Sequence, residues 1–414
     1  MDFIEVTQSM DSETSAVPAH PIMGASWPAM FFCISPLLAF RAWMLAAHPQ
    51  LNDFISYWAT GRVFLAGGHP YAPAAVLAAE RSVGWPDGAP PMMTFCPPWA
   101  LPADAISASF SFHTAMTGWL VISLLLDCFS ALGLWIYFGG EKRKAWIAML
   151  IAATFMPMGA AEYLGQVTPL MLACLVATLF LIRSERYFAI GLLSLGFGFK
   201  PHLLYLVALA MLFWIVQKRA WTMLAGAALS YGAATAAAQW FNPHSIDYLH
   251  RSFSAATEVS CGFGGALRSI FGVQHMWLQF LPCVCGLLWF LSYWGKNRRE
   301  WDWKTHLPLL LLISLCTSPY YWNHDFILIL PALIAVGVRS DFPSPIVFVA
   351  YLTVQAIALA LAFTPAWRAT ASILWVAFYW IAKAQSRHGQ AYSDPVTPSI
   401  RDSDYPGQRP QATL

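Results

Sequence analysis

The sequence predicts an all-α polytopic membrane protein, and three observations lead to that fold class. Hydrophobic residues make up 58% of the 414 residues and charged residues only 11%, whereas a soluble domain has about 25% charged residues. The apolar residues fall in many separate runs close to the length of about 20 that a membrane-spanning helix needs. The net charge of +2 includes no basic block that would bind a nucleic-acid backbone. The same composition excludes intrinsic disorder.

Apolar windows along the chain predict about 12 spans. Residues 1–27 contain no Lys or Arg, so a signal-peptide n-region is absent and the first span is interpreted as an uncleaved anchor. Several spans are shorter than a full crossing, and short or broken helices at membrane depth usually line a cavity. The predicted spans lie near residues 28–47, 112–138, 145–163, 167–182, 187–199, 202–217, 220–240, 277–294, 307–316, 326–338, 344–363 and 369–382.

The distribution of basic residues predicts the orientation. Alternate loops and the C-terminal tail hold 16 of the 23 Lys and Arg residues, and loops rich in these residues stay in the cytoplasm. We therefore expect a multi-pass protein of the inner (plasma) membrane with both termini cytoplasmic. The expected parts are a cytoplasmic segment 1–27, a transmembrane domain 28–382 and a disordered tail 383–414 of Ser/Pro/Asp/Gln composition.

This topology places the segments 48–111, 241–276 and 317–325 outside, and the first of them carries a carboxylate directly after the first span. Asn52 or Asp53 could simply be the N-cap of a short helix that ends at Gly67-Gly68. Alternatively, Asp53 is a carboxylate held at the outer membrane face that accepts a proton. The two roles conflict, because backbone donors lower the pKa of a carboxylate and weaken it as a base.

Two further polar positions lie in outer turns. Gly165-Gln166 follows Glu162 in a tight turn and is either a solvated turn or a ligand contact. Lys200-Pro201 interrupts the apolar stretch 187–217, where an ammonium group is costly and indicates function by default. The alternative is a lysine that extends to the membrane interface.

The third outer segment is unusually polar and aromatic for a turn between spans. It contains Trp322, His324 and Asp325, although the last two could merely pair with each other. The flat ring of Trp322 can stack on a sugar face. Topology adds weight to these weak signals, because Asp53, Gln166, Lys200, His324 and Asp325 come from four distant segments and all fall on the outer side.

No metal or cofactor is expected at this site. The eight cysteines show no zinc or redox spacing, and there is no Gly-rich nucleotide-binding loop. Asp402-Ser403-Asp404 imitates a metal-binding motif, but it falls in the predicted tail on the cytoplasmic side.

The chain resembles glycosyltransferase family 87, polytopic enzymes with the GT-C architecture, over about residues 50–335. Two positions differ from the family pattern, because Cys96 stands where Tyr is usual and Thr168 where Asn often follows the Gly-Gln pair. The resemblance depends on the order and spacing of several motifs together: Asp53…Tyr57, Gly68-His69-Pro70-Tyr71, Phe95-Cys96-Pro97-Pro98, Gly165-Gln166, Lys200-Pro201 and Ser318-Pro319-Tyr320-Tyr321-Trp322-Asn323-His324.

The resemblance implies a helical bundle with outward-facing loops. It also implies an enzyme that transfers a hexosyl unit, with mannose as the favoured sugar, from a polyprenyl phosphate to a lipid or glycan acceptor. In GT-C enzymes an acidic residue of the first outer loop is the base, which corresponds to Asp53. Tyr57 and Tyr71 lie in the same motifs and are expected to bind substrate. Lys200 would stabilise the departing phosphate, with Arg62, Arg251 and Arg268 as further candidates. A single displacement would invert the anomeric carbon.

Physical reasoning favours the same donor class, since charged nucleotide sugars made in the cytosol do not cross a bilayer. Two alternatives stay open. A membrane transporter or lipid flippase would share the composition and the broken helices, although it would often show repeated halves, which are not evident. A GT-C enzyme for another polyprenyl-linked sugar, such as an arabinofuranosyl, glucosyl or aminoarabinosyl unit, is not excluded by the residues.

Overall fold

The structure is a computed structural model, and it describes residues 35, 39, 53–94, 96–248, 261–339, 345–361 and 367–393. The described chain is helical, apart from one isolated antiparallel bridge between Cys261 and Tyr321. The first predicted span, 28–47, lies outside the described residues except for positions 35 and 39.

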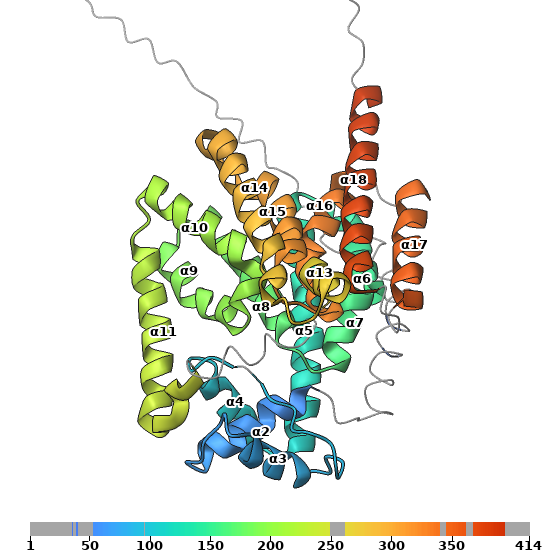
Figure 1. Cartoon of the computed structure of the whole chain (residues 1–414). Coiled ribbons are helices and arrows are strands. Elements are labelled where there is room, and N and C mark those ends of the chain that lie inside the picture. The colour runs from blue at the N-terminus through green and yellow to red at the C-terminus, as the bar shows by residue number, and fades with distance from the viewer. Residues whose placement is uncertain are drawn as a thin grey trace, which may run out of the picture.

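Three short helices form the lower end of the molecule in Figure 1: α2 (Phe54–Leu65), α3 (Pro73–Arg81) and α4 (Leu101–Ala108). Proline at the first or second position starts α3 and α4, where its missing N–H costs nothing. Gly61 lets α2 lie directly against α4, because a Cβ there would come within 2.3 Å of the Asp104 carbonyl oxygen. This glycine therefore fixes the distance between the two helices.

The remaining helices stand above this layer as a bundle, with α11 at one flank and α17 at the other in Figure 1. Its helices are α5 (Phe112–Phe138), α6 (Ala145–Thr154), α7 (Met156–Tyr163), α8 (Thr168–Arg183), α9 (Tyr187–Leu193), α10 (Tyr205–Lys218), α11 (Thr222–Phe241), α13 (Phe263–Phe271), α14 (Leu281–Asn297), α15 (Trp303–Thr317), α16 (Leu330–Arg339), α17 (Pro345–Leu361) and α18 (Trp367–Ser393). The 3-10 turns are η1 (Lys142–Lys144), η2 (Ser194–Phe199), η3 (Pro201–Leu204), η4 (Pro243–Asp247), η6 (Met276–Gln279), η7 (Arg298–Glu300) and η8 (Asn323–Ile329).

The helices occur where the apolar windows predicted them, but about 12 complete spans are not confirmed. Among the described residues, three helical segments are long and apolar enough to cross a membrane: 112–138, 201–218 and 276–300. A fourth would be the pair α6 and α7, which bends by 55° at their junction. Others, such as α8 and α15, are apolar but shorter than a crossing. The apolar helices indicate a multi-pass membrane protein with several broken segments.

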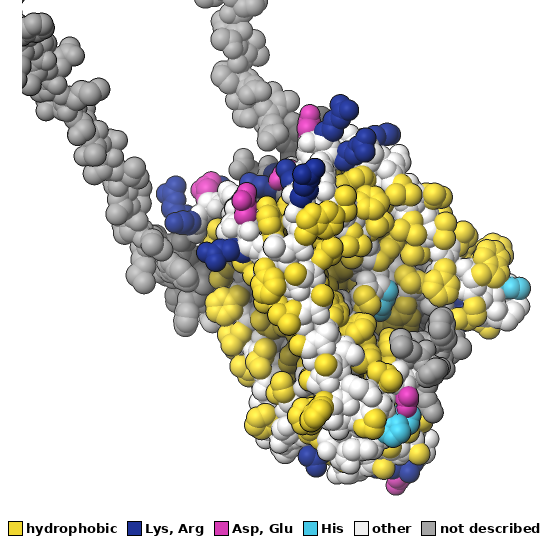
Figure 2. All heavy atoms as spheres, turned by 90° about the vertical axis from the view of Figure 1, so that its left-hand side faces the viewer, with side chains coloured by type: hydrophobic (Ala, Val, Ile, Leu, Met, Phe, Trp, Pro, Cys, Tyr) yellow, Lys and Arg dark blue, Asp and Glu magenta, His cyan; other side chains and the backbone are white. Residues whose placement is uncertain are grey.

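The surface separates into bands. Figure 2 shows hydrophobic side chains over the middle of the visible face and most Lys and Arg side chains at its upper end. Phe129 on α5 and Leu288 on α14 are among the large apolar residues that point outward, 68% and 63% exposed. Side chains of this kind are expected to face lipid.

The C-terminal boundary differs from the prediction. α18 continues through residue 393, past position 383 where a disordered tail was expected to begin. The polar composition of this segment is also compatible with the last turns of an extended helix. Residues 394–414 lie outside the described part of the chain.

Candidate active site

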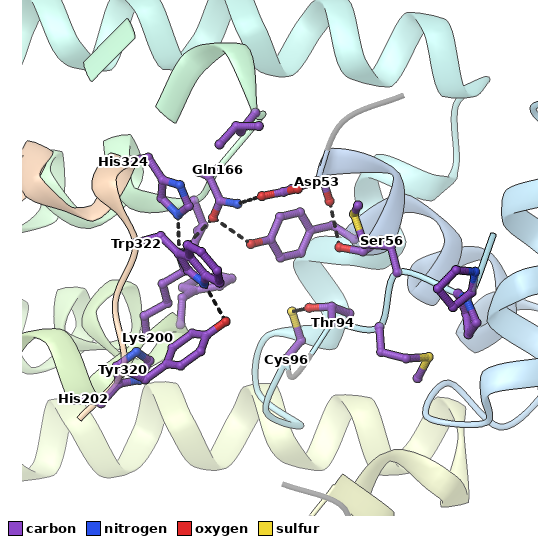
Figure 3. Close-up of a pocket in the computed structure, with 18 of the residues that line it drawn as sticks. Asp53, Ser56, Thr94, Cys96, Gln166, Lys200, His202, Tyr320, Trp322 and His324 are labelled. Carbon is purple, nitrogen blue, oxygen red and sulfur yellow. Dashed lines mark hydrogen bonds between the residues drawn. The ribbon is translucent and has the colours of Figure 1, made fainter. Parts of the chain in front are cut away.

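A cavity of about 710 Å³ opens between the lower helical layer and the bundle. Asp53, Gln166, Lys200 and His324 all line it, and Figure 3 shows their side chains turned toward one another. They come from four separate segments: the start of α2, the turn between α7 and α8, the junction of η2 and η3, and η8. The alternation of spans predicted only that these segments would fall on the same side of the membrane, and the fold brings their side chains together.

Asp53 occupies the N-cap position of α2, but its side chain does not cap the helix. Its backbone is in the α region, and the carboxylate makes no hydrogen bond to the first turn. Instead, Gln166 Nε2 donates to Asp53 Oδ2 over 2.5 Å. The hydroxyl of Ser56 bonds the Asp53 carbonyl oxygen at 2.7 Å. The carboxylate therefore faces the cavity rather than the helix backbone.

Gln166 joins the carboxylate to a cation through its two amide ends. Gly165, at φ +66°, precedes it in a tight turn, a conformation that glycine adopts readily. While Nε2 donates to Asp53, Oε1 accepts from Lys200 Nζ at 2.8 Å and from the Tyr57 hydroxyl at 3.2 Å. The Lys200 and Tyr57 donors thereby fix which way the amide points.

Lys200 lies between two 3-10 helices, and its extended backbone (φ −135°, ψ 70°) together with Pro201 separates them. The side chain is 16% exposed and reaches the cavity. Its ammonium donates to Asp325 Oδ1 at 2.8 Å and lies 3.3 Å from His324 Nε2. Interruption of the apolar stretch thus places a charge on the cavity wall.

Asp325 lies behind the cavity and is fully enclosed, with 1% of its side chain exposed. Besides Lys200, it accepts from the backbone N–H of Trp322 at 2.8 Å, a contact that closes the first turn of η8. The carboxylate therefore neutralises and orients Lys200 without facing the cavity itself.

The electrostatics of the two carboxylates differ. Burial raises the pKa of Asp53 above its usual value, against the opposing effects of the Gln166 hydrogen bond and Lys200. Burial would also raise the pKa of Asp325, but Lys200 and His324 overcome it and lower that pKa. Burial lowers the pKa of His324 to about 4, so its imidazole is neutral at pH 7. Its Nε2 can then accept a hydrogen bond from Lys200.

Aromatic rings border the polar groups. Tyr57, Trp85, Tyr320 and Trp322 line the cavity, and Trp322 Nε1 donates to the Tyr320 hydroxyl at 2.6 Å. Flat rings with polar edges are suited to the mixed apolar and hydroxyl faces of a sugar. Apolar residues complete the wall, among them Pro90, Pro91, Met92, Met93, Leu164, Val167 and Phe199.

Tyr71 is the one predicted substrate-binding residue that the structure holds away from both the cavity and the Lys200 network. It is 3% exposed, and its hydroxyl lies 3.0 Å from the Cys96 carbonyl oxygen and 3.2 Å from that of Ser245. Tyr71 therefore joins the segment that contains Cys96 to the one that contains Ser245. The motif that Tyr71 shares with His69 could not show whether Tyr71 binds substrate or joins two segments, because sequence adjacency does not reveal which way a ring points.

The additional arginine candidates for the phosphate do not line the cavity. Arg62 donates to the Ala108 carbonyl oxygen at 3.2 Å and lies over the Trp58 ring. Arg268 is buried and donates to the Val273 carbonyl oxygen and to Gln279. Arg251 lies outside the described residues. Lys200 is thus the cation that lines the cavity in the described chain.

One wall of the cavity contains the segment 90–94, which was not singled out from the sequence. Buried Glu80 holds it, since both carboxylate oxygens accept from the backbone N–H of Met92, at 3.1 and 3.2 Å. Burial raises the pKa of Glu80 to about 7. Pro90-Pro91 was the available signal, because consecutive prolines favour an extended segment without regular helix.

The comparisons with known proteins identify the family. The sequence model of glycosyltransferase family 87 matches residues 91–319. The chain belongs to glycosyltransferase family 87. It is accordingly a glycosyltransferase, and the resemblance seen in its motifs is confirmed. The transporter alternative does not agree with this membership.

Two curated relatives share most of their length with this family member. Both are named polyprenol-phosphate-mannose-dependent alpha-(1-2)-phosphatidylinositol mannoside mannosyltransferase. The Mycobacterium tuberculosis protein is 23% identical over 336 residues, covering 75% of this chain and 76% of the relative. The Mycolicibacterium smegmatis protein is 24% identical over 366 residues, covering 80% of each. No solved structure matches the chain.

Proposed function

We propose that this glycosyltransferase transfers a mannosyl unit from a polyprenyl phosphate to a lipid or glycan acceptor, with Asp53 as the general base. The observation that supports this most is the placement of a carboxylate and an ammonium group on one cavity wall, joined by the Gln166 amide. The printed names of both relatives describe polyprenol-phosphate-mannose-dependent enzymes, which supports the donor class.

The proposed reaction is a single displacement at the anomeric carbon. The acceptor hydroxyl oxygen forms the new bond to that carbon while its proton passes to Asp53. The bond from the anomeric carbon to the carrier phosphate oxygen breaks, and the electron pair leaves with the phosphate. Lys200 stabilises the charge that develops there, as a preorganised cation does at low dielectric. One displacement inverts the configuration.

The environment of each group supports its role. Burial raises the pKa of Asp53, which makes the carboxylate a stronger base while Gln166 keeps it oriented. Lys200 makes its contacts with Gln166, His324 and Asp325, so an entering phosphate would replace one of them and remain near the charge. The apolar segment of the wall suits a polyprenyl chain, and the four aromatic residues suit the sugar.

The membrane arrangement belongs to the same proposal. We place the cavity at the outer face of the inner membrane, with both termini in the cytoplasm. On the face shown in Figure 2, most Lys and Arg side chains gather at the opposite end of the molecule. A cysteine introduced at position 166 or 324 should then react with an impermeant label on intact cells, whereas one at 143 or 298 should not. Equal labelling of 166 and 298 would contradict this orientation.

The decisive test of the reaction is a panel of polyprenyl-phosphate sugars offered to purified protein in detergent. Mannose should be transferred to an acceptor lipid or glycan in preference to glucosyl, arabinofuranosyl and aminoarabinosyl donors, and the product should have the inverted configuration. Transfer of another sugar would retain the reaction class but change the substrate. Absence of transfer from every donor would contradict the proposed donor class.

A further inference from the structure

A second cluster of chemically capable side chains lies outside the catalytic cavity. It comprises His69, in the loop after α2, with His244 and Asp247 of η4. His69 Nε2 lies 3.1 Å from Asp247 Oδ2, and His244 Nδ1 lies 3.2 Å from the same oxygen. One ligand atom from each residue falls within 4.8 Å of the other two. The two segments are separated by more than 170 residues, so the fold itself creates this grouping.

Buried contacts hold the two segments in place independently of the cluster. Asn242, which is fully buried, donates from Nδ2 to the carbonyl oxygens of Phe64 and Gly68 at 3.2 and 2.7 Å. Its Oδ1 accepts from the backbone N–H of His244 at 3.0 Å. The same side chain therefore fixes the residue before His69 and the start of η4. The positions of the histidines are preorganised by this amide.

The orientation of the two imidazoles is also fixed. The rings of His69 and His244 stack at 4.8 Å with an angle of 14° between their planes, and His69 meets the edge of the Tyr71 ring at 6.2 Å. Each histidine turns a nitrogen toward the same Asp247 oxygen. Two nitrogen ligands and one oxygen ligand therefore lie within 4.8 Å of one another.

We propose that His69, His244 and Asp247 form a binding site for a divalent first-row transition metal such as Zn²⁺. Bonds of about 2.0–2.2 Å to nitrogen and oxygen ligands would separate neighbouring ligand atoms by roughly 3.4 Å in a tetrahedron. The 3.1 and 3.2 Å separations are close to that geometry. Imidazole ligands suit Zn²⁺ and similar ions, whereas Mg²⁺ and Ca²⁺ prefer oxygen alone. Water would complete the coordination, because all three residues are partly exposed.

The metal would act on the architecture of the outer segments and not on the sugar transfer. It would join η4 to the loop after α2, next to the Tyr71 ring. The Tyr71 hydroxyl contacts the carbonyl oxygen of Cys96, a residue that lines the cavity. A metal that stiffens this connection would stabilise the cavity wall from behind. This inference does not depend on the donor or acceptor assigned to the enzyme.

The test is metal binding by the full-length protein in detergent, purified with a tag that contains no histidine and treated with a chelator. Isothermal titration with Zn²⁺ should show one equivalent bound, and the thermal midpoint should rise with Zn²⁺ concentration, since a ligand of the folded state stabilises it. His244→Ala and the isosteric Asp247→Asn should each weaken binding by at least about tenfold. Titration with Co²⁺ should produce visible absorption bands that these variants reduce.

His113→Ala is the matched control, because His113 is an exposed histidine at the start of α5 that lies outside the cluster. It should bind Zn²⁺ as the unmodified chain does. Absence of saturable binding by the unmodified chain would overturn the proposal. Equal Zn²⁺ affinity in the unmodified chain and in well-folded Asp247→Asn would overturn it too, since the metal would then be bound elsewhere.

Discussion

The two carboxylates nearest the cavity, Asp53 and Asp325, occupy opposite environments. Asp53 stands at the start of α2, faces the cavity and is held by the Gln166 amide. Asp325 lies behind the wall in η8, where Lys200 and the Trp322 backbone N–H satisfy its two oxygens. Burial dominates at Asp53 and raises its pKa, whereas the adjacent cation prevails at Asp325 and lowers its pKa.

This difference teaches how one residue type acquires two roles. A carboxylate with a raised pKa and an open face can accept a proton, while one locked in an ion pair holds a charge in place. The direction of each pKa shift also decides how the contribution of each carboxylate to folding stability changes with pH. The stability contribution of Asp53 is present below pH 3.8 and is lost as the pH rises through its raised folded pKa. That of Asp325 is present above pH 3.8 and is lost as the pH falls through its lowered folded pKa.

The largest expected effect is on turnover by Asp53→Asn. General-base catalysis is typically worth about 10²–10⁴ in rate, and the amide keeps the size and hydrogen-bonding capacity while losing the ability to accept the proton. Sugar transfer at saturating donor should fall by that order, with an unchanged or slightly raised thermal midpoint. Asp53→Glu should rescue poorly, because reaction geometry is sensitive to about 1 Å.

The control for this prediction is Asp87→Asn, which changes an exposed carboxylate in the loop between α3 and α4. It should leave turnover and stability unchanged. If well-folded Asp53→Asn transferred sugar at a near-normal rate, Asp53 would have no part in the mechanism. The proton-accepting role assigned to Asp53 in the comparison with Asp325 would then be wrong.

The next effect concerns Lys200. Removal of a preorganised charge-stabilising group costs about 10²–10³ in rate, so Lys200→Ala should lower donor-dependent kcat/KM by at least about 10². Lys200→Arg should retain part of it, because the charge remains but the planar fork differs in shape. Lys218→Ala, at the exposed end of α10, is the matched control. Unaltered donor kinetics in Lys200→Ala would make the residue an interfacial anchor.

Asp325→Asn should act mainly on stability. It leaves the Lys200 ammonium without its anionic partner in a largely enclosed position, and loss of one partner of a buried hydrogen-bonded charge costs about 1–3 kcal/mol or more. Thermal unfolding in detergent should show a lowered midpoint relative to both the unmodified chain and Asp87→Asn. If Asp325→Asn kept a near-normal thermal midpoint but lost as much turnover as Asp53→Asn, Asp325 would itself be the base.

The smallest expected effect is a shift in pH dependence. The acidic limb of kcat/KM should lie above pH 3.8, because the pKa of Asp53 is raised and its protonated form cannot accept a proton. Gln166→Ala removes a hydrogen bond that lowers this pKa, so the limb should move to higher pH. Ser56→Ala is the control, since the Ser56 hydroxyl donates to the backbone carbonyl oxygen of Asp53. A limb that moved to lower pH in Gln166→Ala would contradict the assignment.

The positions of most helices followed from apolar windows because lipid imposes a length and a composition on each crossing. The windows did not show which of these helices run unbroken across the membrane. The window 145–163 reads as one apolar run, yet the structure bends it by 55° between α6 and α7. Met156-Pro157 lies at that junction, and proline interrupts the backbone hydrogen bonds that would keep a helix straight. A hydropathy average does not register such a break.

The sequence by itself determined the membrane class, the family motifs and the set of polar residues that interrupt the apolar segments, since a charge such as Lys200 is tolerated there only for a reason. The tertiary structure decided which of these groups meet and in what environment. It turned Asp53 away from its own helix backbone and toward Gln166, enclosed Asp325 behind Lys200, and directed Tyr71 toward backbone carbonyls instead of the cavity. Burial and partner geometry, which set pKa and role, arise from contacts between segments more than 100 residues apart, and no local pattern encodes them.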